Sequence, residues 1–383
     1  MAGLCTDGGG ASVNRKLPLD PPGSFAPEDV TLLLQDVTGR VEERDVTVRE
    51  REIQAGRHYS EDLPVERPPS AAYLKVFDQL MERQLPQVAL YTGILTRLVL
   101  ETQPKPALVS LVRAGVPCGV LMRRYAARMM GRELPHYGIS IIRGKGFDEA
   151  AISYLLDRHA AEELVFVDGW TGKGMIAKEL AESCEAYNQK HGAALRPALA
   201  VLADPAHAVS LYATREDFVN PSCCLNSTVC GLISRTVHNK ALIGPDEFHG
   251  VRVYWEFAPM DQTARYLDGV CRWFEPLEEK IEAGFQAVLA EDRTPDWAGM
   301  EAVRRIAGAF GVSDLNRVKP SIGETTRVLL RRVPDRILLR EAEHPDAAHI
   351  LLLAQEKGVP ATICPDMPYL CCGLIADKRG ADL

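Results

Sequence analysis

Short apolar runs alternate with amphipathic stretches between residues 106 and 205. The runs ALVSLV, ISII, LVFV and ALAVLA contain few polar positions, which is typical of parallel strands buried on both faces. Stretches such as MIAKELAESCEAY repeat apolar residues every three or four positions, as amphipathic helices do. Repeated strand and helix units predict an α/β fold with helices flanking a parallel sheet, and ligands at the carboxyl ends of its strands.

Helical spacing also precedes this region. Ser70 is expected to cap a helix that runs to Gln84, and a second helix is expected from Leu85 to Glu101. The preceding segment, residues 59–69, carries three prolines and predicts a loop.

The run LVFV leads through Asp168 into a glycine-rich turn and then into a helix. Gly172 and Gly174 let the backbone approach a ligand closely, and Thr171 offers a hydroxyl donor. The first N–H groups of a helix are unsatisfied and carry the positive end of its dipole. The turn therefore predicts a phosphate cradle, although the P-loop pattern GxxxxGK[ST] is absent.

Composition sets the class of protein. The 383 residues are 46% hydrophobic and 25% charged, as in globular proteins, and the net charge of −8 argues against nucleic-acid binding by the whole surface. No apolar run approaches the roughly 18 residues of a membrane helix, and the first 27 residues contain no signal-peptide core, so we expect a cytoplasmic protein. The ten cysteines form no CxxC pair and are expected to be reduced.

Three regions are expected. Residues 1–27, rich in Gly, Pro and Ser, predict a disordered leader. Residues 28–292 predict the main α/β domain with an N-terminal helical hood, and residues 293–383 a small α/β domain. Charge and proline at 291–296 mark the boundary between them.

The order of the loops resembles that of a type I phosphoribosyltransferase. SLVRAGVP is similar to the pyrophosphate loop of that family, RGKG to its mobile loop, and VDGWTG to its phosphoribosyl pyrophosphate loop, with Gly169 where the family has a second acid. More narrowly, RHYSEDLP, PPSAAYLKVF, SLVRAGVP, YGISIIRGKG, FVDGWTGKG and CLNSTVCGLISRTV resemble bacterial phosphoribosyltransferase-type proteins encoded near tellurite-resistance and stress genes. This family is often labelled cysteine protease StiP.

The resemblance implies a transferase that binds phosphoribosyl pyrophosphate and Mg²⁺ and uses a base or nucleoside as acceptor. It implies catalytic roles for Asp168, Arg113 and Lys145, with Asp168 near the metal, directly or through water. The implied phosphate-binding residues are Ser110, Arg113, Ala114, Gly115, Arg143, Lys145, Asp168, Gly169, Thr171, Gly172, Lys173 and Gly174. The expected acceptor wall comprises Tyr59, Glu61, Tyr137, Trp170, Asn226, Ser227, Thr228 and Arg235.

The C-terminal region carries the loop KPSIGETTR between predicted elements. This loop resembles the Pelota and ribosomal-protein type of RNA-binding domain, which implies structured RNA as a partner. The implied RNA-binding residues are Lys319, Gly323, Glu324, Thr325 and Arg327. Residues 317–340 contain seven basic and two acidic side chains, the electrostatic footprint of phosphate binding.

Two other functions stay open at this point. A cysteine protease would need a thiol activated by a histidine, for which Cys224 with His238 and Asn239 are candidates. A non-catalytic protein that senses a nucleotide and binds RNA would need the same loops without chemistry. The sequence does not determine the oligomeric state, and a homodimer is one of the assemblies left open.

Overall fold

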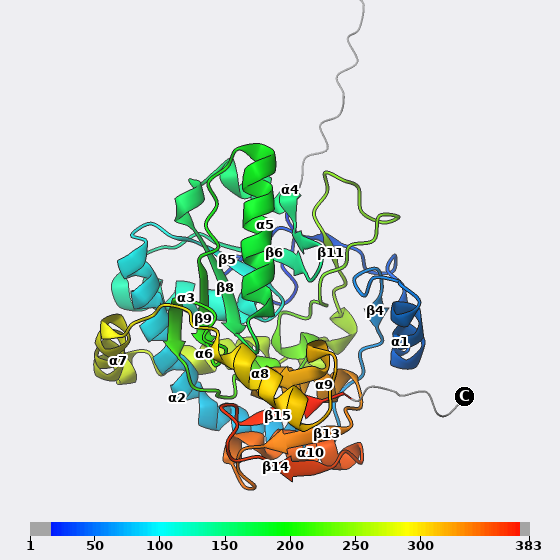
Figure 1. Ribbon diagram of the computed structural model, residues 1–383. Helices are drawn as coiled ribbons and strands as arrows, with labels where there is room; N and C mark the ends of the chain where they lie inside the picture. The colour runs from blue at the N-terminus through cyan, green and yellow to red at the C-terminus, as the bar shows by residue number, and fades with distance from the viewer. Residues whose placement is uncertain (1–16, 376–383) are drawn as a thin grey trace, which may run out of the picture.

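The structure is a computed structural model that describes residues 17–375, in a large α/β domain and a smaller C-terminal one (Figure 1). Part of the expected leader, residues 1–16, lies outside the described residues. The rest of it, residues 17–27, is not a free leader as expected. The N–H of Leu19 donates to the carbonyl of Leu32 at 2.9 Å, and Phe25 is buried. This segment therefore packs as part of the large domain.

The large domain is built on a seven-stranded sheet. Its strands are β1 (Thr31–Leu32), β5 (Ala107–Val112), β6 (His136–Ile142), β7 (Gly146–Phe147), β8 (Leu164–Trp170), β9 (Leu199–Ala203) and β10 (Leu211–Thr214). Six follow the order β1-β6-β5-β8-β9-β10 and pair in parallel, while β7 pairs antiparallel with β6. The predicted parallel sheet is confirmed.

Helices cover both faces of this sheet (Figure 1). Their bounds are α2 (Ala71–Thr102), α3 (Gly115–Met130), α4 (Glu149–Leu156), α5 (Met175–His191), α6 (Thr263–Cys271) and α7 (Glu278–Ala290). Helices α2, α3, α6 and α7 pack together on one face, and α5 lies on the other. The chain leaves β5 toward β6 and leaves β8 toward β9, in opposite directions, so the carboxyl ends of β5 and β8 flank the crevice where such sheets bind ligands.

Helix α2 differs from the prediction of two helices. Ser70 caps it as expected, accepting a hydrogen bond from the N–H of Tyr73 at 3.1 Å. The helix then continues through Pro86 to Thr102. A proline inside a helix removes one backbone hydrogen bond. Burial of the apolar face on both sides of Pro86 compensates for that loss, and this packing cannot be read from local sequence.

Short elements form the hood and the connections. They are α1 (Val46–Gln54), the strands β2 (Gln35–Asp36), β3 (Glu43–Arg44), β4 (Leu63–Pro64) and β11 (Gly250–Val251), and 3₁₀ turns at Ala161–Glu163, Pro221–Cys223, Ser227–Val229, Trp255–Met260, Glu275–Leu277, Leu315–Arg317 and Pro345–Ala347. Strand β2 pairs in parallel with β11, and β3 with β4. Strands β2 and β11, which are far apart in the sequence, thus lie side by side.

The C-terminal domain is a small mixed α/β unit, as predicted. Its elements are α8 (Ala298–Ala309), β12 (Val318–Pro320), α9 (Ile322–Arg331), β13 (Arg336–Leu339), α10 (Ala348–Glu356), β14 (Ala361–Ile363) and β15 (Cys371–Leu374). The sheet order is β12-β15-β13-β14, with β15 antiparallel to both neighbours. Strand β12 includes Lys319 and Pro320, where a loop was expected.

One carboxylate fixes this domain to the large one. Both oxygens of Asp217 accept from the N–H of Ile322 at 3.1 Å, and one also accepts from the N–H of Leu370 at 3.0 Å. Ile322 begins α9, so a negative side chain also complements the helix dipole there. The buried apolar face of α9 is continuous with the core of the large domain. The two domains therefore share one packed interface.

Candidate functional site

A cavity of about 470 Å³ lies between the two domains, at the carboxyl ends of β5, β6 and β8. We call it the interdomain cleft. Nine basic side chains line it, namely Arg49, Arg113, Arg143, Lys173, Arg235, Lys319, Arg327, Arg331 and Arg332, together with the acidic Asp168 and Glu324. Among these lining side chains the cations exceed the acids by seven, which favours an anionic ligand.

The loop after β5 brings Arg113 into the cleft. Its guanidinium donates to the Asn226 side-chain carbonyl at 3.0 Å and to the Ile233 carbonyl at 3.3 Å, and lies 3.7 Å from the Glu66 carboxylate. Gly115 stands where α3 meets β8, because a Cβ there would lie 2.2 Å from the carbonyl oxygen of Val167. Of the predicted loop, Val112 and Arg113 line the cleft, and only Arg113 brings a charged side chain to it.

Ser110, Ala114 and Gly115 do not line the cleft. The hydroxyl of Ser110 is buried, donates to the Gly115 carbonyl at 3.0 Å and lies 2.8 Å from His136 Nε2. Ala114 is buried at the start of α3 and offers no side-chain donor. These three residues hold the strand and helix together, and none lies where it would touch a phosphate in the cleft.

The turn after β8 lines the cleft, but its polar side chains are engaged within the protein. Asp168 Oδ1 accepts from the N–H of Gly169 at 2.8 Å, and burial raises the pKa of its carboxyl to about 6. The hydroxyl of Thr171 donates to the carboxylate of Asp204. It is therefore engaged inside the protein and does not serve as the expected phosphate donor.

Both remaining glycines of this turn contact the C-terminal domain. A Cβ at Gly172 would lie 2.4 Å from a carboxylate oxygen of Glu324, and one at Gly174 would lie 2.5 Å from the ring of Trp297. Gly174 also has φ of 79° at the start of α5. Close packing between the domains therefore accounts for the glycines that predicted a phosphate cradle.

Lys173 belongs to the same interface. Its side chain is 2% exposed, and its ammonium donates to the carbonyls of Leu315 at 2.6 Å and Val318 at 3.0 Å. Burial lowers the pKa of Lys173 to about 8, with Glu324 acting in the opposite direction. The lysine therefore joins the turn to the C-terminal domain.

The depressed pKa of Lys173 predicts a stability change in alkali. Between about pH 8 and the unfolded-state value of roughly 10.4, the unfolded chain binds the proton that the folded chain releases, so wild-type stability rises relative to Lys173→Met as pH increases. Urea unfolding of both proteins from pH 7 to 10.5 measures this difference, in which all shared titrations cancel. A difference in unfolding free energy that is independent of pH would contradict the assignment.

The loop after β6 separates its two cationic residues. Arg143 lines the cleft and donates to the side-chain carbonyl of Asn316 at 2.7 Å. Lys145 is absent from the cleft wall, and its ammonium donates to the Ser60 hydroxyl at 3.1 Å and the His238 carbonyl at 3.3 Å. The expected catalytic role of Lys145 therefore lacks a position at the cleft.

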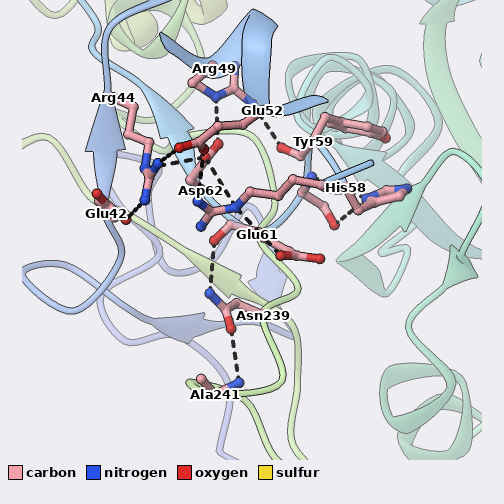
Figure 2. A network of polar contacts seen from close by, with 12 residues as sticks. Glu42, Arg44, Arg49, Glu52, His58, Tyr59, Glu61, Asp62, Asn239 and Ala241 are labelled. Carbon is pink, nitrogen blue, oxygen red and sulfur yellow. Dashed lines mark hydrogen bonds and ion pairs between the residues drawn. The ribbon is translucent and has the colours of Figure 1, made fainter. Parts of the chain in front are cut away.

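The hood contributes Tyr59 to the cleft, with the Arg235 guanidinium 5.0 Å from its ring centre. Glu61 instead joins the polar network of Figure 2, where its backbone carbonyl accepts from Asn239 at 3.1 Å. At the centre of that network, the buried Asp62 pairs with Arg49 at 2.5 Å. Sequence reasoning missed Arg49, which lies outside the motifs that carried the resemblance, and Asp62, which lies within RHYSEDLP but was not singled out.

The other residues expected to form the acceptor wall do not lie together. Asn226, Thr228 and Arg235 line a second pocket of about 380 Å³ beside the cleft, which we call the side pocket. Ser227 donates through its hydroxyl to Glu66 at 2.6 Å. Tyr137 lies elsewhere, with its hydroxyl 3.0 Å from His159 Nε2.

The expected RNA-binding residues lie at the interface. Lys319, Glu324 and Arg327 line the cleft, and the Arg327 guanidinium stacks 4.5 Å from the centre of the Trp170 ring. Gly323 packs so closely that a Cβ would lie 2.1 Å from that ring. Thr325 is buried, and its hydroxyl donates to the Lys319 carbonyl at 3.0 Å. The loop thus faces the large domain.

A protein-held magnesium site is not supported by these residues. Within residues 17–375, no group of three or more His, Cys, Asp or Glu side chains is arranged to hold a metal ion. Asp168 is a single carboxyl with a raised pKa beneath several cations. Mg²⁺ favours ionised carboxylates, and a raised pKa makes the ionised form of Asp168 less favourable. The binding of Mg²⁺ stays an untested prediction.

The nominated protease residues do not meet. Cys224 is buried, burial raises its pKa well above the ordinary value, and its sulfur lies 3.8 Å from that of Cys223. The ring of His238 stacks on His249 with centres 4.3 Å apart, and Asn239 contacts the hood. Within residues 17–375, no cysteine thiol hydrogen-bonds to a histidine.

The architecture defines a class: an α/β domain with a parallel sheet, joined through a basic cleft to a small mixed α/β domain. Comparison with known families makes this more specific. Residues 23–271 match the family described as tellurite-like stress resistance cysteine protease StiP, and residues 297–377 match the PELOTA RNA binding domain. The chain belongs to this StiP family.

A curated relative supports the assignment. Cysteine protease StiP of Acinetobacter baylyi (strain ATCC 33305 / BD413 / ADP1) is 36% identical over 367 residues, which cover 92% of this chain and 94% of the relative. No solved structure matches the chain. No helix within residues 17–375 is long and apolar enough to cross a membrane.

These findings correct the expected activity. The StiP family and the C-terminal Pelota-type domain are confirmed, as is the link to tellurite-like stress resistance. The prediction of a phosphoribosyltransferase was wrong, because the family and the relative are both described as cysteine proteases. The enzyme class that the comparisons support is cysteine protease, and the transfer of phosphoribosyl groups from phosphoribosyl pyrophosphate is withdrawn.

Proposed function

We propose that this StiP-family protein binds RNA in the interdomain cleft and that it also acts as a cysteine protease. The geometry favours the RNA-binding function most strongly. The observation that carries it is the wall of the cleft, where nine cationic side chains face two acidic ones.

Such a wall is costly without a ligand. Burial lowers the pKa of Arg331 well below its ordinary range, and the neighbouring guanidiniums of Arg113 and Arg327 lower it further. Burial also lowers the pKa of Lys319 and lowers that of Arg235 to about 10. Each of these cations would be stabilised by an anion that replaces lost water, as the phosphates of RNA would do.

The two domains contribute to one wall. Lys319 and Arg327 come from the part of the chain that matches the PELOTA RNA binding domain, whereas Arg113 and Arg143 come from the StiP domain. Phosphates follow one another along an RNA strand, so a strand placed in the cleft would contact both sets. This favours RNA over a small isolated anion.

The double variant Lys319→Gln/Arg327→Gln tests RNA binding. Fluorescence anisotropy with single-stranded RNA at several salt concentrations is expected to show affinity at least about tenfold weaker and a salt slope reduced by roughly 1 to 2. Arg336→Gln is the matched control, because this exposed arginine belongs to the same basic segment but lies outside the cleft wall. Equal losses in both proteins would contradict binding in the cleft.

Protease activity is supported by the family and by the relative. Cys230 is a buried thiol with two guanidiniums in its surroundings. Burial raises its pKa to about 11, but the guanidiniums of Arg113 and Arg327 act in the opposite direction. Burial raises the pKa of Cys184 to about 12 with no such opposition. Peptide cleavage by Cys230 would still require a rearrangement that brings a base to the thiol.

Cleavage of an unfolded, fluorescently labelled protein tests this role. Cys230→Ser is expected to abolish cleavage, while Cys224→Ser and Cys364→Ser are expected to retain it, because the contacts of Cys230 include the cationic surroundings that a thiolate needs. Circular dichroism would establish that all three variants fold. Full activity in Cys230→Ser would exclude it as the nucleophile, and loss only in Cys224→Ser would favour the other thiol.

A further inference from the structure

The side pocket adjoins the interdomain cleft without belonging to it. It is lined by residues 63–69 of the hood, by the segments at 225–235 and 254–260, and by the end of α9. Arg113, Arg235, Arg331 and Arg332 line both spaces. RNA phosphates in the cleft account for these cations but leave the rest of the side pocket without a role.

The far wall of the side pocket is apolar and aromatic. Tyr254 and Phe257 stack with ring centres 5.5 Å apart and an interplanar angle of 12°. Leu225, Met260 and Leu330 complete this wall. A flat aromatic ligand would bury its faces against such surfaces, as nucleobases do on protein aromatic rings.

Polar groups on the other side can define an edge of that ligand. Glu66 directs one carboxylate oxygen to Ser227, while the other lies 3.7 Å from Arg113 and keeps acceptor capacity. Thr228 adds a hydroxyl group to the lining, whereas the hydroxyl of Ser234 donates to the Arg235 carbonyl at 2.6 Å. Apolar walls with a few converging donors and acceptors are typical of sites for small planar molecules.

One buried donor lacks a partner at this junction. Nη1 of Arg235 is shielded from solvent and makes no hydrogen bond within residues 17–375. The other terminal nitrogen of the same guanidinium donates to the carbonyls of Tyr59 and Asp62, which holds the group in place. A buried N–H without an acceptor is unfavourable, so a ligand that brings an oxygen or nitrogen acceptor to Arg235 would be favoured.

We propose that the side pocket binds an unstacked nucleobase of the RNA whose adjoining phosphate lies among the shared guanidiniums. This inference rests on the proposed RNA binding and adds a base-binding site to it. The base stacks on Phe257, which Tyr254 supports from behind, and its polar edge meets Arg235 and Glu66. The arginines at the junction lie between the pocket for the base and the cleft for the phosphate.

An abasic ribose–phosphate chain distinguishes base binding in the side pocket from phosphate binding in the cleft. Wild-type protein is expected to bind short oligoadenylate or oligouridylate about tenfold more tightly than an abasic ribose–phosphate chain of the same length, because stacking adds to phosphate contacts. In Phe257→Ala this ratio is expected to fall close to one, with the affinity for the abasic chain unchanged. Trp273→Ala, which removes an exposed aromatic residue outside the pocket, is the matched control and should keep the ratio.

Each outcome has a distinct meaning. Equal binding of both chains by the wild-type protein would overturn the nucleobase pocket and leave RNA binding in place. Failure to bind either chain would overturn the proposed RNA binding and, with it, the pocket. A ratio that survives in Phe257→Ala but falls in Trp273→Ala would place base recognition elsewhere.

Discussion

Gly115→Ala is expected to destabilise the protein by about 3 kcal/mol or more, or to prevent folding. A Cβ at this position would lie 2.2 Å from the carbonyl oxygen and 3.1 Å from the carbonyl carbon of Val167. Both atoms belong to the backbone of β8, which is held on each side by hydrogen-bonded strands. Relief would require α3 to move away from the centre of the sheet and would displace Arg113 from the cleft.

Gly308→Ala is the control for this substitution. Gly308 lies in α8, where nothing stands within 4 Å of an added Cβ, so alanine is expected to stabilise the protein by about 0.5 to 1 kcal/mol. Urea unfolding of both variants measures the two effects. An unfolding midpoint for Gly115→Ala equal to that of the wild type would mean that α3 and β8 can separate at little cost.

Arg331→Met is expected to weaken RNA binding on the order of 100-fold while it stabilises the unliganded protein by about 1 kcal/mol. The guanidinium of Arg331 lies close to those of Arg113 and Arg327, and its pKa is lowered by burial and by these neighbours. Methionine has a similar length and no charge, so it removes the repulsion and keeps much of the packing. The variant also lacks the guanidinium that would bind a phosphate of the RNA, and its affinity for RNA therefore falls.

Thermal unfolding without RNA and anisotropy with RNA measure the two parts of this prediction. Arg305→Met makes the same change on the exposed part of α8, outside the cleft wall, and should alter neither quantity appreciably. Destabilisation of Arg331→Met with unchanged RNA affinity would assign the guanidinium a purely structural role. Loss of affinity together with higher stability would instead identify a charge that is retained for binding.

Much of the fold could be predicted from the chain because local pattern determines it. The run ALVSLV is apolar throughout and is buried throughout as β5, and the pattern after Gly174 begins a helix at Met175. The same reasoning placed Asp168 and Arg113 at the carboxyl ends of neighbouring strands, where the cleft lies. These conclusions depend on periodicity and chain order alone.

Contacts between distant segments could not be predicted in that way. The side chain of Lys173 bonds to carbonyls in the C-terminal domain, and the hydroxyl of Thr171 bonds to Asp204 in the next strand–turn unit. Both were expected to face phosphate because each stands beside a glycine at a helix start. Local sequence cannot distinguish a glycine that makes room for a ligand from one that makes room for another domain.

The prediction of a phosphate cradle has the same physical origin. Gly172 and Gly174 lie where a Cβ would meet a side chain across the interface. A pattern that indicated a small phosphorylated substrate therefore also arises from tight domain packing. The basic character of the surroundings was predicted correctly for residues 317–340, but the contributions of Arg49 and Arg235 depend on the folded hood.

The central position of β15 makes the C-terminal domain vulnerable to a single cut. Strand β15 pairs with both β12 and β13, so its release would leave two unpaired edges of the kind through which proteins aggregate. Leu370, which bonds to Asp217, immediately precedes this strand. Release of β15 would therefore expose both strand edges and remove a contact that holds the C-terminal domain at the wall of the cleft.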